Sequence, residues 1–177
     1  MSERYKKILR WLAVVFIVAT VTHVGVIFVI PRGMMWIASY VLGNRIGTNS
    51  FFHADRPNFE NQAVVRSSPD LIYSACAYDV SAHPIRVTAP LTGSYMSLSM
   101  YAADTACFFV RNDRQAPKGF DVVVLGPDSP DRKIEGATTV RAPSARGFML
   151  FRNFAGSGAQ VKKIEEIRRQ AKIETAD

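Results

Sequence analysis

The most prominent hydrophobic feature is an apolar run over residues 11–30, WLAVVFIVATVTHVGVIFVI, which contains no charged residue. As a helix, a run of this length extends about 30 Å, the thickness of the hydrocarbon core of a bilayer. Inside that core, a single segment satisfies its backbone hydrogen bonds only as a helix. The pattern therefore predicts one transmembrane helix over 11–30, with the lipid bilayer as its partner.

The flanks of this run set its expected limits. Pro31 is predicted to stop the helix, and Arg32 to mark the far interface. Trp11 and Trp36 suit the two interfacial belts. Residues 33–47 form a shorter apolar segment with helical spacing, which suggests a separate interfacial or packed helix. This segment also raises the hypothesis of bilayer sensing, which would fail if it packs on the domain that follows.

Beyond a loop-like stretch at 48–66, the hydrophobic period changes to two from Ser67 onward. Ile72, Ser74, Cys76 and Tyr78 fall on one face of the first predicted strand. Short strands separated by Gly, Pro and Asp turns are typical of a β-sandwich or jelly-roll-like sheet. The expected strands are 71–80, 85–89, 95–101, 105–110, 120–125, 139–142 and 147–154.

The C-terminal segment returns to helical spacing over 159–173, with a narrow apolar stripe through Ile164 and Ile167. Its other face is charged, and we expect Glu166 and Arg168 on it to be solvated. The chain is thus predicted to be mainly β, with one N-terminal transmembrane helix and a C-terminal amphipathic helix. The expected regions are 1–10 as a cytoplasmic basic tail, 11–30 as the transmembrane helix, 31–66 as a juxtamembrane helix and loop, 67–155 as the β domain, and 156–177 as the C-terminal helix.

Charge predicts the orientation of this chain. Arg4, Lys6, Lys7 and Arg10 precede the apolar run, and they account for much of the net charge of +7. Basic residues stay on the cytoplasmic side, so the N-terminus is predicted to be cytoplasmic and the β domain periplasmic, at the inner membrane. The remaining basic residues are spread among carboxylates, so no nucleic-acid partner is expected.

A cleaved signal peptide is the main alternative to an uncleaved anchor. The apolar core of a signal peptide is about 7–15 residues long and ends in a small-residue cleavage pattern. The run at 11–30 is longer, and the residues around Pro31 show no such pattern. An uncleaved signal anchor is therefore the favoured interpretation.

Residues capable of metal or redox chemistry are few. Cys76 and Cys107 both lie in predicted strands, where a disulfide and two free thiols are equally compatible with the sequence. His23, His53 and His83 are scattered over a membrane span, a loop and a turn. Because no ligand spacing is present, neither a metal nor a cofactor is expected.

Four polar residues are the candidates for a ligand site, and no catalytic residue is predicted. Arg152 lies inside the apolar strand FMLFRNF, so it needs either a structural partner or an anion to bind. Asp70 and Asp104 fall at strand ends, where carboxylates usually bond turn amides. Tyr73 completes the set.

Several short motifs together resemble a known bacterial family, the domain of unknown function 1254. They run in order from SPDLIYS at 68–74 through DVS at 79–81, Tyr95, DT at 104–105 and VLGP at 124–127 to APS at 142–144 and the strand 148–152. The resemblance covers residues 67–155. It implies a β-sandwich-like fold and no assigned reaction.

The resemblance also implies a partner. Larger members of the family look like two-part proteins in which this domain precedes a companion β domain, the domain of unknown function 1214. This chain resembles a short, membrane-anchored form, so the companion is expected on a separate envelope protein. At two positions that are usually polar in the family, this chain has Leu71 and Ala106. These departures weaken the hypothesis that the chain is an enzyme.

Two functions therefore remain open from the sequence. The first is a non-catalytic envelope assembly subunit that pairs with a companion β domain. The second is a small-molecule-binding or hydrolytic domain that uses the mouth of the sandwich. A concave pocket that unites Asp70, Tyr73, Asp104 and Arg152 would favour the second. An exposed apolar patch or an unpaired sheet edge would favour the first.

Overall fold

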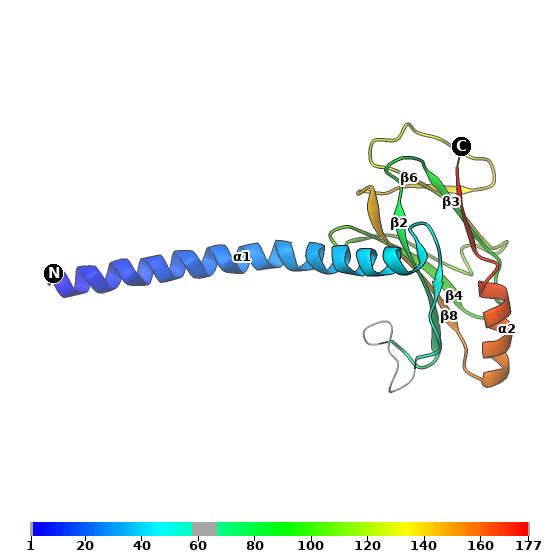
Figure 1. The fold of residues 1–177 in the computed structure, drawn as a ribbon, viewed down its shortest axis with the longest axis horizontal. Helices are drawn as coiled ribbons and strands as arrows, with labels where there is room; N and C mark the ends of the chain where they lie inside the picture. The colour runs from blue at the N-terminus through cyan, green and yellow to red at the C-terminus, as the bar shows by residue number, and fades with distance from the viewer. Residues whose placement is uncertain (1, 58–66, 177) are drawn as a thin grey trace.

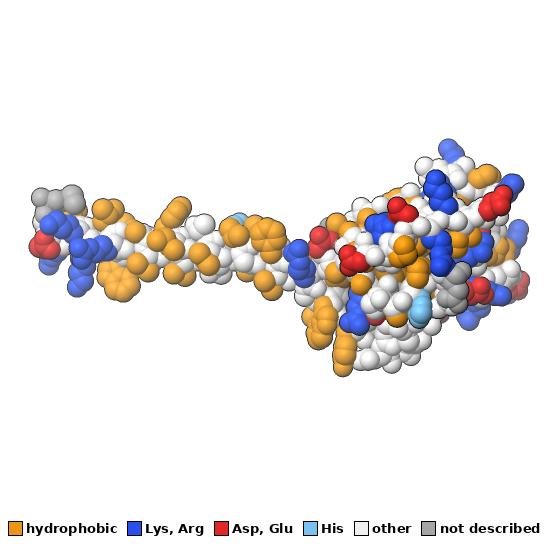
Figure 2. Space-filling model, turned by 90° about the horizontal axis from the view of Figure 1, so that it is seen from above, with side chains coloured by type: hydrophobic (Ala, Val, Ile, Leu, Met, Phe, Trp, Pro, Cys, Tyr) orange, Lys and Arg blue, Asp and Glu red, His pale blue; other side chains and the backbone are white. Residues whose placement is uncertain are grey.

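A computed structural model describes residues 2–57 and 67–176 of the chain. One long helix, α1 (Glu3–Ile46), projects from a β-sandwich domain (Figure 1). Hydrophobic side chains cover the projecting helix, and basic side chains gather at its free end (Figure 2). The helix is long and apolar enough to be a membrane span or a signal sequence.

The helix does not stop at Pro31, which corrects the prediction. Proline lacks the N–H that would bond the carbonyl four residues earlier, but it removes only that one donor. In addition, an Arg32 guanidinium nitrogen donates to the Phe28 carbonyl oxygen at 3.1 Å. The apolar segments on both sides of Pro31 therefore form one continuous helix of 44 residues.

The segment 33–47 is accordingly the last part of α1 and not a separate helix. Its final turn packs on the β domain through Leu42 and Ile46. The helix ends at Gly47, whose positive φ of 88° is easy only for glycine. Because this segment is attached to the domain, the condition for bilayer sensing by a separate helix is not met.

The described residues of the domain form two sheets. Sheet A has the antiparallel order β1-β2-β8-β4-β5, and sheet B has the order β7-β6-β3-β9, in which β6 and β7 are parallel. The strands of sheet A are β1 (Phe52–His53), β2 (Leu71–Asp79), β8 (Arg146–Phe154), β4 (Met96–Ala102) and β5 (Cys107–Asn112). The strands of sheet B are β7 (Thr138–Arg141), β6 (Phe120–Leu125), β3 (Ile85–Ala89) and β9 (Lys172–Thr175).

The main core lies between the two sheets. Alternation places Cys76 and Tyr78 of β2 on its sheet A side, as predicted from the period of two. Leu98, Met100 and Phe151 complete that side, and residues of β3 and β6 close it from sheet B. The predicted β-sandwich class is therefore confirmed.

The sandwich extends beyond the predicted 67–155. Helix α2 (Gly158–Arg168) starts at Ser157 with a capping box and ends at Arg168, five residues before the expected end. Lys172–Thr175 instead form β9, which pairs with β3. Likewise β1 lies in the stretch expected to be a loop, and it pairs with β2.

Candidate functional site

The outer face of sheet A, which points away from sheet B, brings two of the predicted site residues together. Tyr73 of β2 and Arg152 of β8 are direct cross-strand partners, so their side chains share that face. Ser97 of β4 pairs with Arg152 from the other side. The centre of sheet A thus carries an arginine surrounded by strands.

Arg152 contacts hydroxyl groups and no carboxylate among the described residues. One guanidinium nitrogen donates to Ser99 Oγ at 3.2 Å and another to the Tyr101 hydroxyl at 2.8 Å. Hydroxyl oxygens hold the guanidinium in place but do not neutralise its charge. Since a guanidinium carries five N–H donors, Arg152 retains capacity for an anionic partner.

Exposed apolar side chains surround this arginine on the same side of the sandwich. Val110 of β5 is 61% exposed and Phe154 of β8 is 40% exposed. Both share the outer face by register, since Val110 pairs with Ser99 and Phe154 pairs with Leu71. Tyr95, just before β4, is also exposed. Exposed apolar side chains around an arginine are a composition typical of protein–protein interfaces.

The edge of sheet A adds a second feature to this surface. Within residues 2–57 and 67–176, strand β5 has β4 as its only sheet neighbour. Along it, Cys107 and Val110 are exposed, while the other side chains are partly buried. An edge strand presents unpaired backbone groups that can accept a further strand. The surface formed by Tyr95, Tyr101, Val110, Arg152 and Phe154 is called the outer patch below.

The two predicted aspartates do not join the outer patch. Asp70 precedes β2 and forms an ion pair with Arg56 at 3.7 Å. Asp104 lies in the β4–β5 turn, where its Oδ1 accepts from the Ala106 N–H at 3.0 Å. The two residues lie at opposite ends of sheet A, on strands that pair with β8 over at least seven residues, which is six steps or about 20 Å. The structure therefore does not bring the four candidates into one site.

Tyr73 has a structural contact of its own. Its hydroxyl accepts a hydrogen bond from the Ser68 N–H at 2.9 Å, and its side chain is buried. Tyr73 therefore supports the region beside Arg152 and is not an open binding group.

The two cysteines are both free thiols. Cys76 is buried in the core on β2, and Cys107 is exposed on β5. Strands β8 and β4 lie between β2 and β5, so the two residues are about 14 Å apart across the sheet. Burial raises the pKa of the Cys76 thiol to about 12, so it remains protonated and unreactive.

A buried arginine near α2 was missed at the sequence level. Arg168 is 2% exposed, although the sequence placed it on a solvated helix face. Its guanidinium donates to the carbonyl oxygens of Tyr73 at 2.8 Å and Ala54 at 2.9 Å, and it pairs with Glu165. These bonds attach α2 to the β1–β2 edge of sheet A, which is a structural role.

His53 lies close to this arginine. Its Nδ1 is 2.9 Å from Ser74 Oγ, and Ser74 is buried. Burial, followed by the positive charges of Arg168 and Arg169, lowers the pKa of His53 below 6.5. A neutral His53 beside Ser74 resembles a catalytic pair in which the histidine is the base and the serine is the nucleophile. However, Ser74 is 1% exposed, so no substrate can reach it in this conformation.

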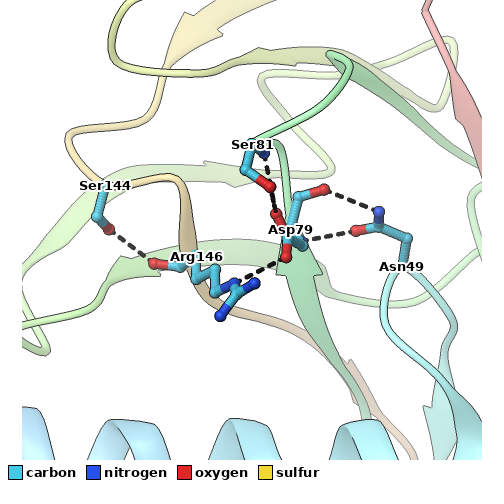
Figure 3. A network of polar contacts seen from close by, with 5 residues as sticks. All are labelled: Asn49, Asp79, Ser81, Ser144 and Arg146. Carbon is cyan, nitrogen blue, oxygen red and sulfur yellow. Dashed lines mark hydrogen bonds and ion pairs between the residues drawn. The ribbon is translucent and has the colours of Figure 1, made fainter.

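A polar network fixes the junction between α1 and β2 (Figure 3). The Asn49 side chain bonds the backbone N–H and C=O of Asp79, each at 2.9 Å. The Asp79 carboxylate accepts from Ser81 and from Arg146 Nε at 2.7 Å. Burial alone would raise the pKa of Asp79, but the bonds from Ser81 and Arg146 outweigh it and keep that pKa below its usual value.

Two concave sites on the described residues are formed by other residues than the predicted four. One groove lies between α1 and the ends of β2 and β8, and another lies beside the β5–β6 connection. Neither is lined by Asp70, Tyr73, Asp104 or Arg152. Among residues 2–57 and 67–176, no group of three His, Cys, Asp or Glu side chains could hold a metal ion.

Comparisons with known proteins identify relatives of this chain by sequence and by fold. A family model described as "Protein of unknown function (DUF1254)" matches residues 48–175. This range includes β1 and β9, which lie outside the predicted 67–155. No curated protein matches the chain.

Two solved structures share the fold. The VPA0106 protein from Vibrio parahaemolyticus has a TM-score of 0.67 and 19% identity, over 84% of this chain and 36% of that chain. An uncharacterized protein from Burkholderia cenocepacia has a TM-score of 0.51 and 19% identity, over 86% of this chain and 41% of that chain. This chain therefore spans well under half the length of both proteins, and the likeness shows the fold alone.

Proposed function

Because this chain belongs to the family described as Protein of unknown function (DUF1254), which carries no assigned reaction, we propose that it is a membrane-anchored, non-catalytic assembly subunit. In this proposal α1 spans the inner membrane, with its N-terminus in the cytoplasm and the sandwich in the periplasm. The outer patch docks a companion β domain carried by another envelope protein.

Support for the anchor comes from α1 itself. The helix is apolar over its middle, and none of its most apolar window is buried by the domain. A helix with exposed apolar side chains all around it needs a lipid or protein environment. Four basic residues at its free end favour retention of that end in the cytoplasm.

Support for docking comes from the outer patch. Its decisive feature is Arg152, which lies among exposed apolar side chains and, within the part of the chain that the structure describes, is held only by hydroxyl groups. Arginine and aromatic residues contribute most of the affinity at many interfaces. The partner proposed here therefore has an apolar surface with a carboxylate positioned to meet Arg152.

The greater length of the solved relatives is compatible with a partner that is itself a folded domain. In both of them this fold accounts for less than half of the chain, so it is joined to additional protein. In this proposal, a folded domain corresponding to that additional protein covers the outer patch. For this chain we propose that such a domain is supplied by a second protein.

The alternative, a small-molecule-binding or hydrolytic domain, has weaker support. It requires the polar candidates to converge, whereas Asp70 and Asp104 lie at opposite ends of sheet A. Arg152 alone could still hold a small anion, and the experiment below separates this case from docking.

The test is purification of the tagged full-length protein from its native membrane in mild detergent, followed by mass spectrometry of co-purified proteins. We expect one envelope protein in stoichiometric amount with the wild type, and its loss with Arg152→Gln. Lys133→Gln is the matched control, because Lys133 is exposed in the β6–β7 connection of sheet B. The control should retain the partner.

Two results would overturn the docking proposal. One is a wild-type protein that carries no stoichiometric protein partner. The other is a partner retained equally by Arg152→Gln and Lys133→Gln. A small anion that co-purifies with the wild type and is lost with Arg152→Gln would instead favour the alternative function. Circular dichroism of each variant would show that the fold is retained.

A further inference from the structure

A groove of about 480 Å³ lies where the second half of α1 passes the ends of β2 and β8. One wall is a stripe of α1 that includes Trp36, Tyr40 and Gly43. The opposite wall is formed by Asp79 of β2 and Arg146 of β8. The groove is separate from the outer patch, since it shares none of that surface's residues.

The helical wall of the groove is aromatic and unusually exposed. The rings of Trp36 and Tyr40 are stacked, with centroids 5.4 Å apart and an interplanar angle of 15°. Trp36 is 66% exposed and Tyr40 is 57% exposed, although both rings are large. Tryptophan and tyrosine favour the membrane–water interface, where an apolar ring and a polar tip are both accommodated.

The sheet wall of the groove offers unused hydrogen-bond donors. Arg146 uses Nε for Asp79, and its side chain is 75% exposed. Its two terminal guanidinium nitrogens have no hydrogen-bond partner within the described residues. A guanidinium fixed at Nε presents a planar pair of donors, which matches the geometry of a phosphate group.

The position of the groove along α1 connects it to the membrane. Trp36 lies six residues beyond Ile30, about 9 Å along the helix, and its side chain leans back toward the N-terminus. The headgroup layer is about 5–8 Å thick on each side of the hydrocarbon core. Arg32, one turn before Trp36, bonds back to Phe28 in the same direction. Because α1 is continuous, the end of the groove at Trp36 stays at this height.

We propose that this groove holds the headgroup of a phospholipid from the bilayer that α1 spans. The phosphate lies on the terminal nitrogens of Arg146, and the remaining headgroup lies against Trp36 and Tyr40. This inference rests on the membrane anchor in the proposed function, but not on the docking of a partner. In this proposal, the bound lipid stabilises the contact between α1 and sheet A.

Native mass spectrometry of the full-length protein, titrated in detergent with dioleoylphosphatidylethanolamine, tests the proposal. We expect Arg146→Gln to weaken retention of the first lipid about ten-fold, as fits the loss of charge-assisted bonds. Arg114→Gln is the control, because Arg114 is exposed in the β5–β6 connection. It should retain lipid like the wild type.

A second pair of variants keeps the test valid if Arg146→Gln disturbs the junction. Trp36→Ala should also reduce retention, whereas Ile37→Ala should not, since Ile37 has similar exposure but does not line the groove. Equal retention by the wild type, Arg146→Gln and Trp36→Ala would overturn the proposal. So would equal competition by inorganic phosphate, which would identify a site for free phosphate.

Extraction of the native membrane with alkaline carbonate distinguishes failure of this inference from failure of the anchor. A protein that stays in the membrane but shows no groove-dependent lipid retention refutes the lipid site only. A protein released into the soluble fraction refutes the anchor, and the lipid site with it.

Discussion

The two faces of sheet A differ in what covers them. On the inner face, Leu98 and Met149 are 0% exposed, because sheet B packs against them. On the outer face, the end of α1 covers Ala75 and Ala77, while Val110 and Phe154 stay exposed. Packing between the two sheets accounts for the burial of these apolar inner-face side chains. It does not explain an apolar outer patch with an arginine at its centre, and this difference is the basis for the proposed partner.

The largest expected effect comes from crowding the inner face. A Cβ at Gly147 would lie 2.2 Å from the Tyr101 carbonyl oxygen and 2.4 Å from the Tyr78 hydroxyl. Gly147→Ala should therefore lower the free energy of unfolding by about 3 kcal/mol, measured by urea denaturation. Gly158→Ala is the control, because nothing lies within 4 Å of a Cβ there. Equal stability of the two variants would contradict the packing described for this face.

Removal of the buried arginine at the β1–β2 edge should have the next largest effect. Arg168→Ala deprives the Tyr73 and Ala54 carbonyl oxygens of a charged donor. The expected loss is about 2–3 kcal/mol in the free energy of unfolding. Arg169→Ala serves as the comparison, because Arg169 is largely exposed and pairs with Glu165 only at 3.6 Å. A smaller loss for Arg168→Ala than for Arg169→Ala would rule out the structural role.

A pair of isosteric substitutions measures the difference between the faces directly. Val122→Thr places a hydroxyl in the core, where Val122 is 1% exposed, and should cost about 1–3 kcal/mol. Val110→Thr on the outer patch should change stability by no more than about 0.5 kcal/mol. Thermal unfolding of both variants checks this. Similar losses would mean that the outer patch is already part of the fold's own core.

The smallest expected effect is a pH dependence that comes from His53. Its folded pKa is lowered, so the unfolded state binds a proton more readily as the pH falls to 6.5 and below. The free energy of unfolding should therefore decrease with acidification in that range, and the contribution vanishes well above 6.5. His53→Gln should flatten this part of the profile. An unchanged slope would show that His53 does not titrate with a lowered pKa.

Asp79 contributes in a separate and more acidic window. Its pKa is held below 3.8 in the folded state, so its stabilising contribution is present above that value and is lost as the pH falls through the folded pKa. The His53 and Asp79 effects can thus be distinguished in a single pH series.

Most of the fold could be predicted from local patterns. The period of two identified β2 and β6 close to their observed limits, because alternation reports directly on a half-buried strand. Strand β9 was missed because four residues carry too little pattern, and they become a strand only by pairing with β3. The length of α1 was missed for a different reason, since the loss of one hydrogen bond at Pro31 is small beside the bonds that remain.

The candidate site was less accessible to prediction. Arg152 was recognisable because a charge inside an apolar strand is unusual, and the structure leaves it without a carboxylate partner among the described residues. Arg168 gave no such signal, because its burial depends on how α2 sits over the β1–β2 edge. Asp70 and Asp104 looked equivalent in the sequence, and only the strand register separates them.

The most direct test of the central claim is photo-crosslinking in cells with a photoreactive amino acid at position 110, on the outer patch. Position 88 is the control, because Thr88 lies on the outer face of sheet B. The proposed docking predicts one defined adduct with another envelope protein from position 110, and none from position 88. Absence of an adduct at position 110, or the same adducts from both positions, would contradict it.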